Sequence, residues 1–220
     1  MAQRAMTPRD VTFSSAALAA VVSDASGQDA TPAVDAVCWA FHEAPEHAFR
    51  LADKVVDDAW KAGAIGDEEN KEQYGCVRLL LESAVRNLHS GLDLTAQLLD
   101  AVFFNARLGN GRTRMKRLLS ALRECGQASA VVAAVDALQA DPDWLMFEAM
   151  ANTLKHRKEI PHRQYVLENQ FAFQVEDGWI LQSELRKAVS NVQGRFMRVL
   201  SALQDDARVV PHGEKDLPQS

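Results

Sequence analysis

Apolar residues recur every three or four positions along most of this chain, which is the spacing of amphipathic helices. The longest such stretch extends for about seven turns between Val77 and Phe103. Shorter helical stretches are predicted around residues 49–60, 118–122, 131–138, 142–157 and 185–200. The pattern therefore predicts a protein that is mainly α-helical.

After Pro161 the helical spacing gives way to alternation. Apolar and polar residues alternate from Tyr165 to Val175, and the pair Asp177-Gly178 that follows is typical of a hairpin turn. We therefore expect a small β-hairpin near residues 163–181, before a last amphipathic helix. The predicted fold class is all-α in the main, an antiparallel helical bundle with one small hairpin.

A single folded domain is predicted over residues 34–206. Residues 1–33 are rich in Ala, Ser, Asp and Thr, which favours a flexible leader with room for one short helix over 13–22. Residues 207–220 contain two prolines and a glycine and predict a disordered tail.

Cysteine content and hydropathy bear on the compartment. The three cysteines, Cys38, Cys76 and Cys125, are too far apart for a C-x-x-C motif, and an odd number does not suit a disulfide framework. No run approaches the ~18 apolar residues of a membrane span. The Ala/Val-rich run near the N-terminus is interrupted by polar residues, which disfavours a cleaved secretory signal. We expect a cytoplasmic protein with no membrane segment.

Charge is distributed unevenly along the chain. The net charge of -6 combines -8 from residues 1–100 (8 Lys/Arg, 16 Asp/Glu), +4 from residues 101–163 (10 and 6) and -2 from the remainder (6 and 8). The basic part holds two clusters: Arg107, Arg112, Arg114, Lys116, Arg117 and Arg123, then Lys155, Arg157, Lys158 and Arg163. These cations either attract phosphate or neutralise the acidic half of the same molecule.

The motifs of metal and nucleotide chemistry are incomplete in this sequence. His42 and His47 lie five residues apart with Pro45 between them, whereas the zinc motif needs a spacing of four on one helical face. They favour a loop at a helix start. The glycines of Gly109-Asn-Gly111 are not followed by Lys-Ser/Thr, so they indicate a turn rather than a phosphate loop. We expect neither a metal ion nor a cofactor.

A polar stripe follows the longest predicted helix. Its members are three or four residues apart, which suits ordinary ion pairs on a solvated surface: Glu82, Arg86, His89, Asp93, Gln97 and Asp100.

The strongest candidate site is the end of the predicted helix 142–157, where the sequence reads Asn152-Thr-Leu-Lys155-His156-Arg157-Lys158. Asn152 and His156 are four residues apart and share one helical face. An imidazole there can act as acid or base in phosphodiester cleavage, and Lys155, Arg157 or Lys158 can bind the phosphate. The structural alternative is that His156 packs against the bundle or caps the last carbonyls of the helix.

In sequence, the long helix carrying Gly91-Leu-Asp-Leu-Thr-Ala-Gln-Leu-Leu99, a basic helix, and Ala151-Asn-Thr-Leu-Lys-His-Arg157 together resemble a bacterial branch of the HEPN superfamily. The resemblance spans roughly residues 70–205, including the hairpin and the last helix. It implies a helical bundle that pairs as a homodimer around the motif helix. It also implies that active members are metal-independent RNases whose motif is an arginine, commonly followed by asparagine, and then a histidine four to six residues on.

This chain departs from the motif at one position. Asn152 and His156 match the asparagine and the histidine, but Ala151 stands where the arginine is expected. Arg157 and His162 satisfy R-x4-H literally, yet Pro161 lies between them, so the pair straddles a helix end.

Three functions remain open at this level. The departure at Ala151 favours a module that binds RNA or a nucleotide, or that regulates, without catalysis. The first alternative is an RNase with His156 as acid/base and Asn152 as its positioning group. The second is a scaffold whose basic helix binds an acidic protein partner.

Overall fold

The fold is a bundle of helices with a small sheet at one end, as the hydrophobic pattern predicts. The computed structural model describes residues 13–61, 71–106, 115–157, 162–165, 170–175 and 178–210. The elements in chain order are α1 (Ser15–Ser26), α2 (Thr31–Cys38), η1 (Trp39–Glu43), α3 (Ala44–Lys61), α4 (Lys71–Phe104), α5 (Met115–Glu124), α6 (Ser129–Gln139), α7 (Pro142–Arg157), β1 (His162–Tyr165), β2 (Gln170–Val175), β3 (Gly178–Leu181) and α8 (Gln182–Ala207). The predicted fold class, mainly all-α with a small hairpin, is confirmed.

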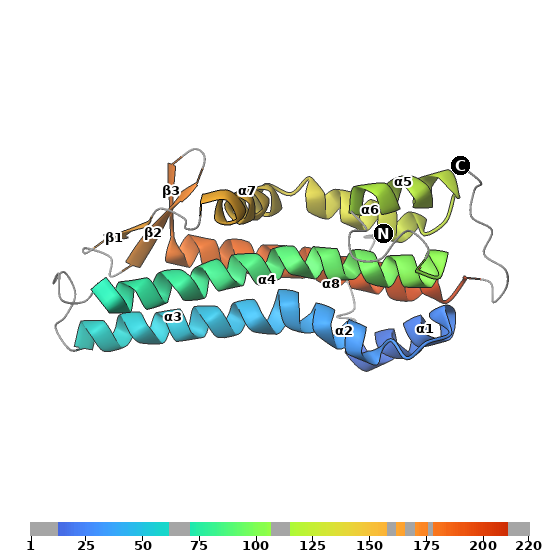
Figure 1. Cartoon of the computed structure of the whole chain (residues 1–220), viewed down its shortest axis with the longest axis horizontal. Helices are drawn as coiled ribbons and strands as arrows, with labels where there is room; N and C mark the ends of the chain where they lie inside the picture. The colour runs from blue at the N-terminus through green and yellow to red at the C-terminus, as the bar shows by residue number, and fades with distance from the viewer. Residues whose placement is uncertain are drawn as a thin grey trace, which may run out of the picture.

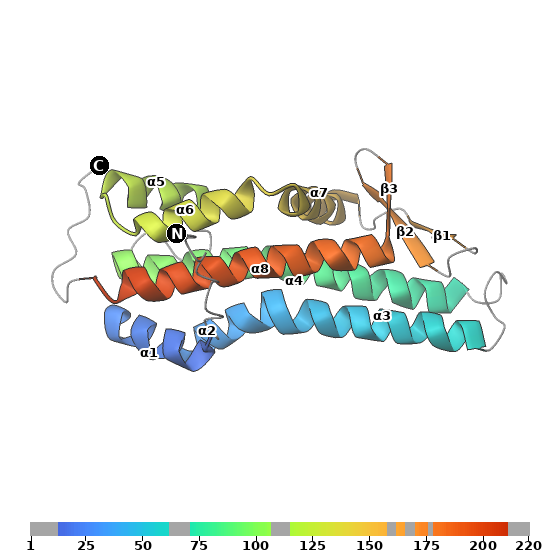
Figure 2. The same ribbon diagram turned by 180° about the vertical axis from the view of Figure 1, so that it is seen from behind.

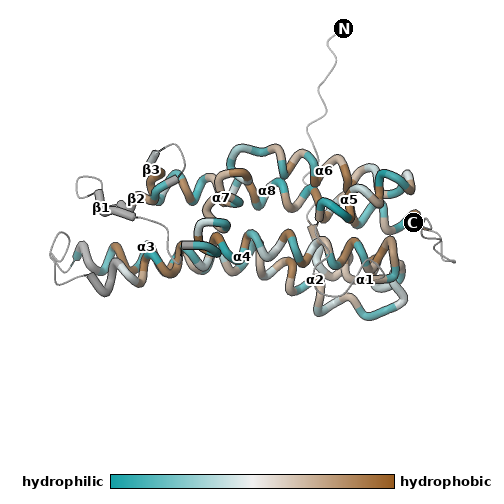
Figure 3. The backbone as a smooth tube through the Cα atoms, turned by 45° about the horizontal axis from the view of Figure 1, so that its top comes forward, coloured by the Kyte–Doolittle hydropathy of each residue, from teal (hydrophilic) through white to brown (hydrophobic). Residues whose placement is uncertain are grey.

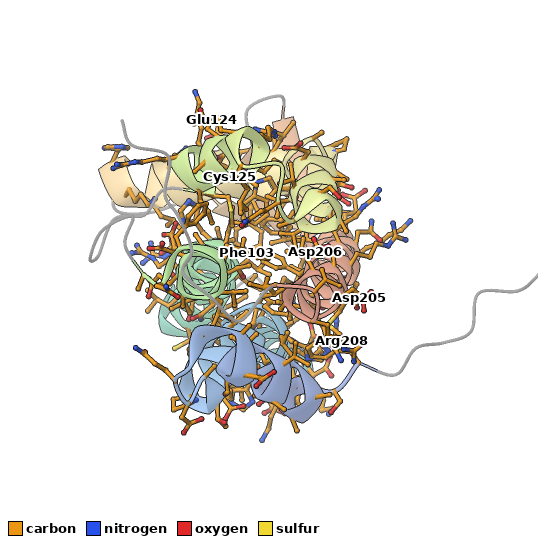
Figure 4. All side chains as sticks on the ribbon, turned by 90° about the vertical axis from the view of Figure 1, so that its right-hand side faces the viewer. Phe103, Glu124, Cys125, Asp205, Asp206 and Arg208 are labelled. Carbon is orange, nitrogen blue, oxygen red and sulfur yellow. The ribbon has the colours of Figure 1, made fainter. Side chains whose placement is uncertain are left out.

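The helices form three layers. α4 and α8 lie side by side in the middle, with α3, α2 and α1 in line on one side of them (Figures 1 and 2). On the other side lie α5, α6 and α7. The end view in Figure 4 shows the same three layers. One continuous core connects them, because each helix turns its apolar residues toward its neighbours.

α1 belongs to the folded bundle, which differs from the predicted leader over residues 1–33. Leu18 and Val22 are fully buried, and α1 packs against α2 and α8. The predicted domain boundary at residue 34 falls inside α2. The composition misleads here because small Ala and Val side chains give a weak periodic signal, although they bury well against a neighbouring helix. At the other end, residues 211–220 of the predicted tail lie outside the described residues.

A π-helical turn replaces the loop that the sequence predicts around His42 and Pro45. η1 connects α2 to α3 without interruption, and Pro45 sits in the first turn of α3, where a missing N–H costs nothing. Gln193 on α8 donates from Nε2 to two carbonyls of the turn, that of Phe41 at 3.2 Å and that of His42 at 3.1 Å. The π turn is therefore held from the opposite helix.

Gly91 lets α4 approach this turn closely. A Cβ at Gly91 would lie 3.0 Å from the Cβ of Phe41, a distance at which one of the two helices must move. Phe41 in turn stacks on Phe196 of α8, with ring centroids 4.7 Å apart. Three helices thus meet at one glycine, so a side chain at residue 91 would push α4 away from η1.

Polar contacts join the start of α8 to α3 and its end to α6. At its start, Gln182 Nε2 donates to Asp53 Oδ1 at 2.7 Å, and Arg186 pairs with Asp53 and with Glu46 at 2.9 Å. At its end, Asp206 accepts a hydrogen bond from the backbone N–H of Val131 at 2.9 Å, and so caps α6. Figure 4 looks onto this second end of the bundle, where Asp206 is labelled.

The sheet contains one strand more than the predicted hairpin over 163–181. β1, β2 and β3 pair antiparallel in sequence order, with Phe173 of β2 opposite His162 on one side and Ile180 on the other. Phe173 and Ala172 are buried, and β2 contacts both α7 and α8. The sheet directly follows α7 and therefore sits beside the candidate motif (Figure 1).

Within the described ranges, no helix combines the length and the apolar character needed to cross a bilayer.

Candidate functional site

α7 crosses the long helices instead of running along them. Figure 1 looks nearly down its axis, and Figure 3 shows it lying across the long helices, in contact with both α4 and α8. Its N-terminus is capped by Asp141, whose Oδ1 accepts the N–H of Asp143 at 3.0 Å. Asp141 Oδ2 also accepts from Arg195 Nε at 3.0 Å, and Asn191 donates to Asp143 at 2.8 Å. These contacts fix the first turn of α7 to α8.

Trp144 anchors the next turn of α7. Its side chain is 1 % exposed and lies between α8 and α4. The ring meets Phe196 edge-on with centroids 5.9 Å apart, and it stacks against His89 of α4 at 6.4 Å. α7 is therefore held against both long helices before it reaches the candidate motif.

The candidate residues lie at the far end of the helix. Asn152, Lys155 and His156 are all exposed, and α7 ends at Arg157. The side chain of Arg157, and Lys158 altogether, lie outside the described residues. Helical geometry places Asn152 and His156 on one exposed face, with Lys155 on the neighbouring face toward α4.

Ala151, where the resemblance expects an arginine, lies in the hydrophobic core. It is 3 % exposed, and Leu154 beside it is equally buried. On a helix, residues 151 and 156 point about 140° apart, so they do not face a common ligand. A guanidinium at residue 151 would need a buried partner charge. The literal R-x4-H pair is also divided, because Arg157 ends α7 whereas His162 begins β1.

His89 on α4 is the residue at this site that the sequence analysis did not select. Its Nε2 lies 3.5 Å from Nζ of Lys155, and its Nδ1 lies 3.9 Å from Oδ2 of Asp93. The ring is largely covered, since its side chain is 19 % exposed. The helix crossing thus brings together two basic side chains that are 66 residues apart.

Burial lowers the pKa of the His89 imidazole, because a covered ring loses the hydration that stabilises its charged form. The positive charge of Lys155 lowers this pKa further, while the carboxylates of Asp93 and Glu148 act in the opposite direction. His89 is therefore a neutral histidine held beside a lysine.

The polar stripe on α4 is not the uniform surface that its spacing predicts. Glu82 and Asp100 are buried, whereas Arg86, Asp93 and Gln97 are exposed. A straight helix crossed by neighbours at different heights is covered on different sides along its length. The prediction of a solvated surface therefore holds only for the middle of the stripe.

No family model matches this chain, and no curated protein or solved structure matches it either.

Arg123 and Lys155, one from each basic cluster, differ in how their charges are compensated. Arg123 of α5 pairs with both carboxylate oxygens of Asp136 on α6, at 2.5 and 2.7 Å. Within the described part of the chain, no carboxylate forms an ion pair with Lys155. The described residues also contain no group of three His, Cys, Asp or Glu side chains that could hold a metal ion. Lys155 is thus an exposed cation whose close neighbour is a neutral imidazole.

Proposed function

We propose that the C-terminal end of α7 binds the phosphate groups of RNA or of a nucleotide, without cleaving them. The observation that carries the proposal is the position of Lys155, which is exposed and has no ion-pair partner among the described residues. Asn152 and His156 offer hydrogen-bonding groups one turn apart beside it. The resemblance to the HEPN superfamily supports the same ligand class.

Affinity at this surface must come from side chains, not from the helix itself. The C-terminal end of a helix carries the negative end of the macrodipole, which disfavours an anion. A lysine that reaches beyond the last turn overcomes this through direct charge-assisted contacts with phosphate oxygens. Binding through such contacts weakens steeply as salt rises, since the phosphates release counterions on binding.

The test measures binding of fluorescein-labelled single-stranded RNA to the full chain at low and moderate salt. Lys155→Ala should weaken binding about fivefold, because an exposed charge pair contributes up to about 1 kcal/mol. Lys54→Ala is the matched control, since Lys54 is exposed on α3, on the opposite side of the α4–α8 layer (Figure 1). Absence of RNA binding at low salt, or equal effects of the two variants, would overturn the proposal.

Cleavage is the competing function that the resemblance implies, with His156 as acid/base. The burial of Ala151 supports binding over cleavage, because the group expected to hold the scissile phosphate is missing from the exposed face. Labelled RNA incubated with the protein in EDTA should therefore stay intact. Cleavage by the parent chain that disappears in His156→Ala would establish the RNase instead.

Pairing of two copies through this face is a separate proposal. Its support is Leu145, which is 51 % exposed and lies seven residues before Asn152 on the same helical face. Sedimentation equilibrium should find a dimer that Leu145→Glu dissociates. Leu79→Glu is the control, since Leu79 is 57 % exposed on α4. A monomeric parent chain would refute the pairing.

A further inference from the structure

We propose that His89 and Lys155 form one proton-coupled anion site, in which binding of a phosphate group to Lys155 makes His89 take up a proton. This deepens the proposed function and rests on it. The contact between the two side chains bridges α4 and α7, so the site depends on how the helices cross and not on the motif alone.

The contact with Lys155 favours one tautomer of His89. An ammonium group can only donate hydrogen bonds, so the Nε2 atom of His89, 3.5 Å from Nζ of Lys155, is an acceptor when it carries no proton. The ring proton then sits on Nδ1, which points toward Oδ2 of Asp93 at 3.9 Å. Trp144 covers a face of the ring. These contacts suit a neutral His89 that accepts at Nε2.

Charged groups on α4 and α7 act on the protonation of His89 in opposite directions. Asp93 on α4 and Glu148 on α7 favour the imidazolium, while Lys155 and the burial of the ring oppose it. A single added charge can shift such a balance. A phosphate bound to Lys155 supplies a negative charge next to Nε2 and offsets the positive charge that opposes protonation.

Protonation then gives the anion a second contact. One proton from solvent binds Nε2 of His89, whose N–H becomes a donor toward the phosphate oxygen that Lys155 holds. The anion lies between the imidazolium and the ammonium and removes their mutual repulsion. By linkage, affinity rises as pH falls through the range between the His89 pKa of the bound state and the lower pKa of the free state, by up to about tenfold per pH unit.

The experiment follows the His89 ring by NMR in the full chain, with its signal assigned through His89→Gln. The ligand is a 5′-hydroxyl oligoribonucleotide, whose phosphodiesters keep their charge over the range of the titration. We expect the oligoribonucleotide to raise the pKa of His89 in the parent chain. Lys155→Met should raise it without ligand, and added ligand should then change it little. Lys54→Met should behave as the parent.

Each result separates this inference from the proposed function. If RNA binds in a Lys155-dependent way and the pKa of His89 does not move, the proposed function stands and the coupled site is refuted. If Lys155→Met leaves the pKa of His89 unchanged in the free protein, the contact itself is refuted, whether or not RNA binds. If no RNA binds at low salt, both proposals fail.

Discussion

The two ends of α7 differ in what their polar residues contact. At the first end, Asp141 and Asp143 bind side chains of α8, and Trp144 fills the space between the long helices. At the last end, Asn152 and His156 are exposed, and Lys155 reaches the His89 imidazole. The first end of α7 thus fixes the helix in the fold, whereas the last end presents polar groups to solvent. Substitutions at the two ends should therefore change different properties.

The largest effect on stability is expected at Trp144. Trp144→Ala should lower the free energy of unfolding by about 3–5 kcal/mol, because it leaves a cavity between α4, α7 and α8. Leu79→Ala, at an exposed leucine of α4, should change it by less than about 0.5 kcal/mol. Urea unfolding followed by circular dichroism measures both values. Equal losses would show that Trp144 does not anchor the helix.

A smaller loss is expected at the cap of α7. Asp141→Ala removes both the acceptor for the N–H of Asp143 and the partner of Arg195, and should cost about 1–2 kcal/mol. Asp141→Asn keeps a capping oxygen and should cost less. If the two variants were equally unstable in urea, the charge facing Arg195, and not the cap, would be the main contribution.

Stability should also depend on pH through His89. The pKa of His89 is lowered in the folded chain, so below the ordinary histidine pKa of about 6.5 the unfolded state binds more protons than the folded state. This contribution to the free energy of unfolding is present above that pH and is lost as pH falls below it. His89→Gln should therefore lose less stability than the parent between about pH 7.5 and 5. Parallel losses in urea titrations would contradict the lowered pKa.

The smallest effects on stability are expected at the exposed end. Asn152→Ala and Lys155→Ala should each change the free energy of unfolding by no more than about 0.5 kcal/mol, since surface substitutions remove few contacts. Lys155→Ala should nevertheless weaken RNA binding. A large loss of stability in either variant would assign this end a structural role and remove the contrast between the two ends.

Local periodicity predicts the features that are set within a single helix. The spacing of Trp144, Phe147, Ala151 and Leu154 predicts a helix over 142–157, and it already places Asn152 and His156 together on one face. The structure places these two side chains at the surface. The burial of Ala151 follows from the same pattern, because this residue belongs to the apolar set.

Features set by contacts between different helices are not predictable in this way. His89 sits in a stripe of polar residues that periodicity assigns to the surface, and nothing near it in sequence indicates Lys155. The sequence shows that Gly91 lies inside a helix. It does not show why a glycine is needed there, which is the close approach of Phe41 from another segment. The packing of α1 into the bundle is not predictable either, because Ala-rich helices show little contrast between their faces. Each of these features is set by contacts between segments far apart in the chain.

The proposed RNA site is the last turn of α7, next to His89. Backbone amide chemical shifts of the full chain, recorded during titration with single-stranded RNA at low salt, test it most directly. The shifted amides should cluster at Asn152 to Arg157 and around His89, and Lys155→Ala should weaken the titration. Shifts confined to another surface, such as Lys116 and Arg117 on α5, or no shifts at all, would contradict it.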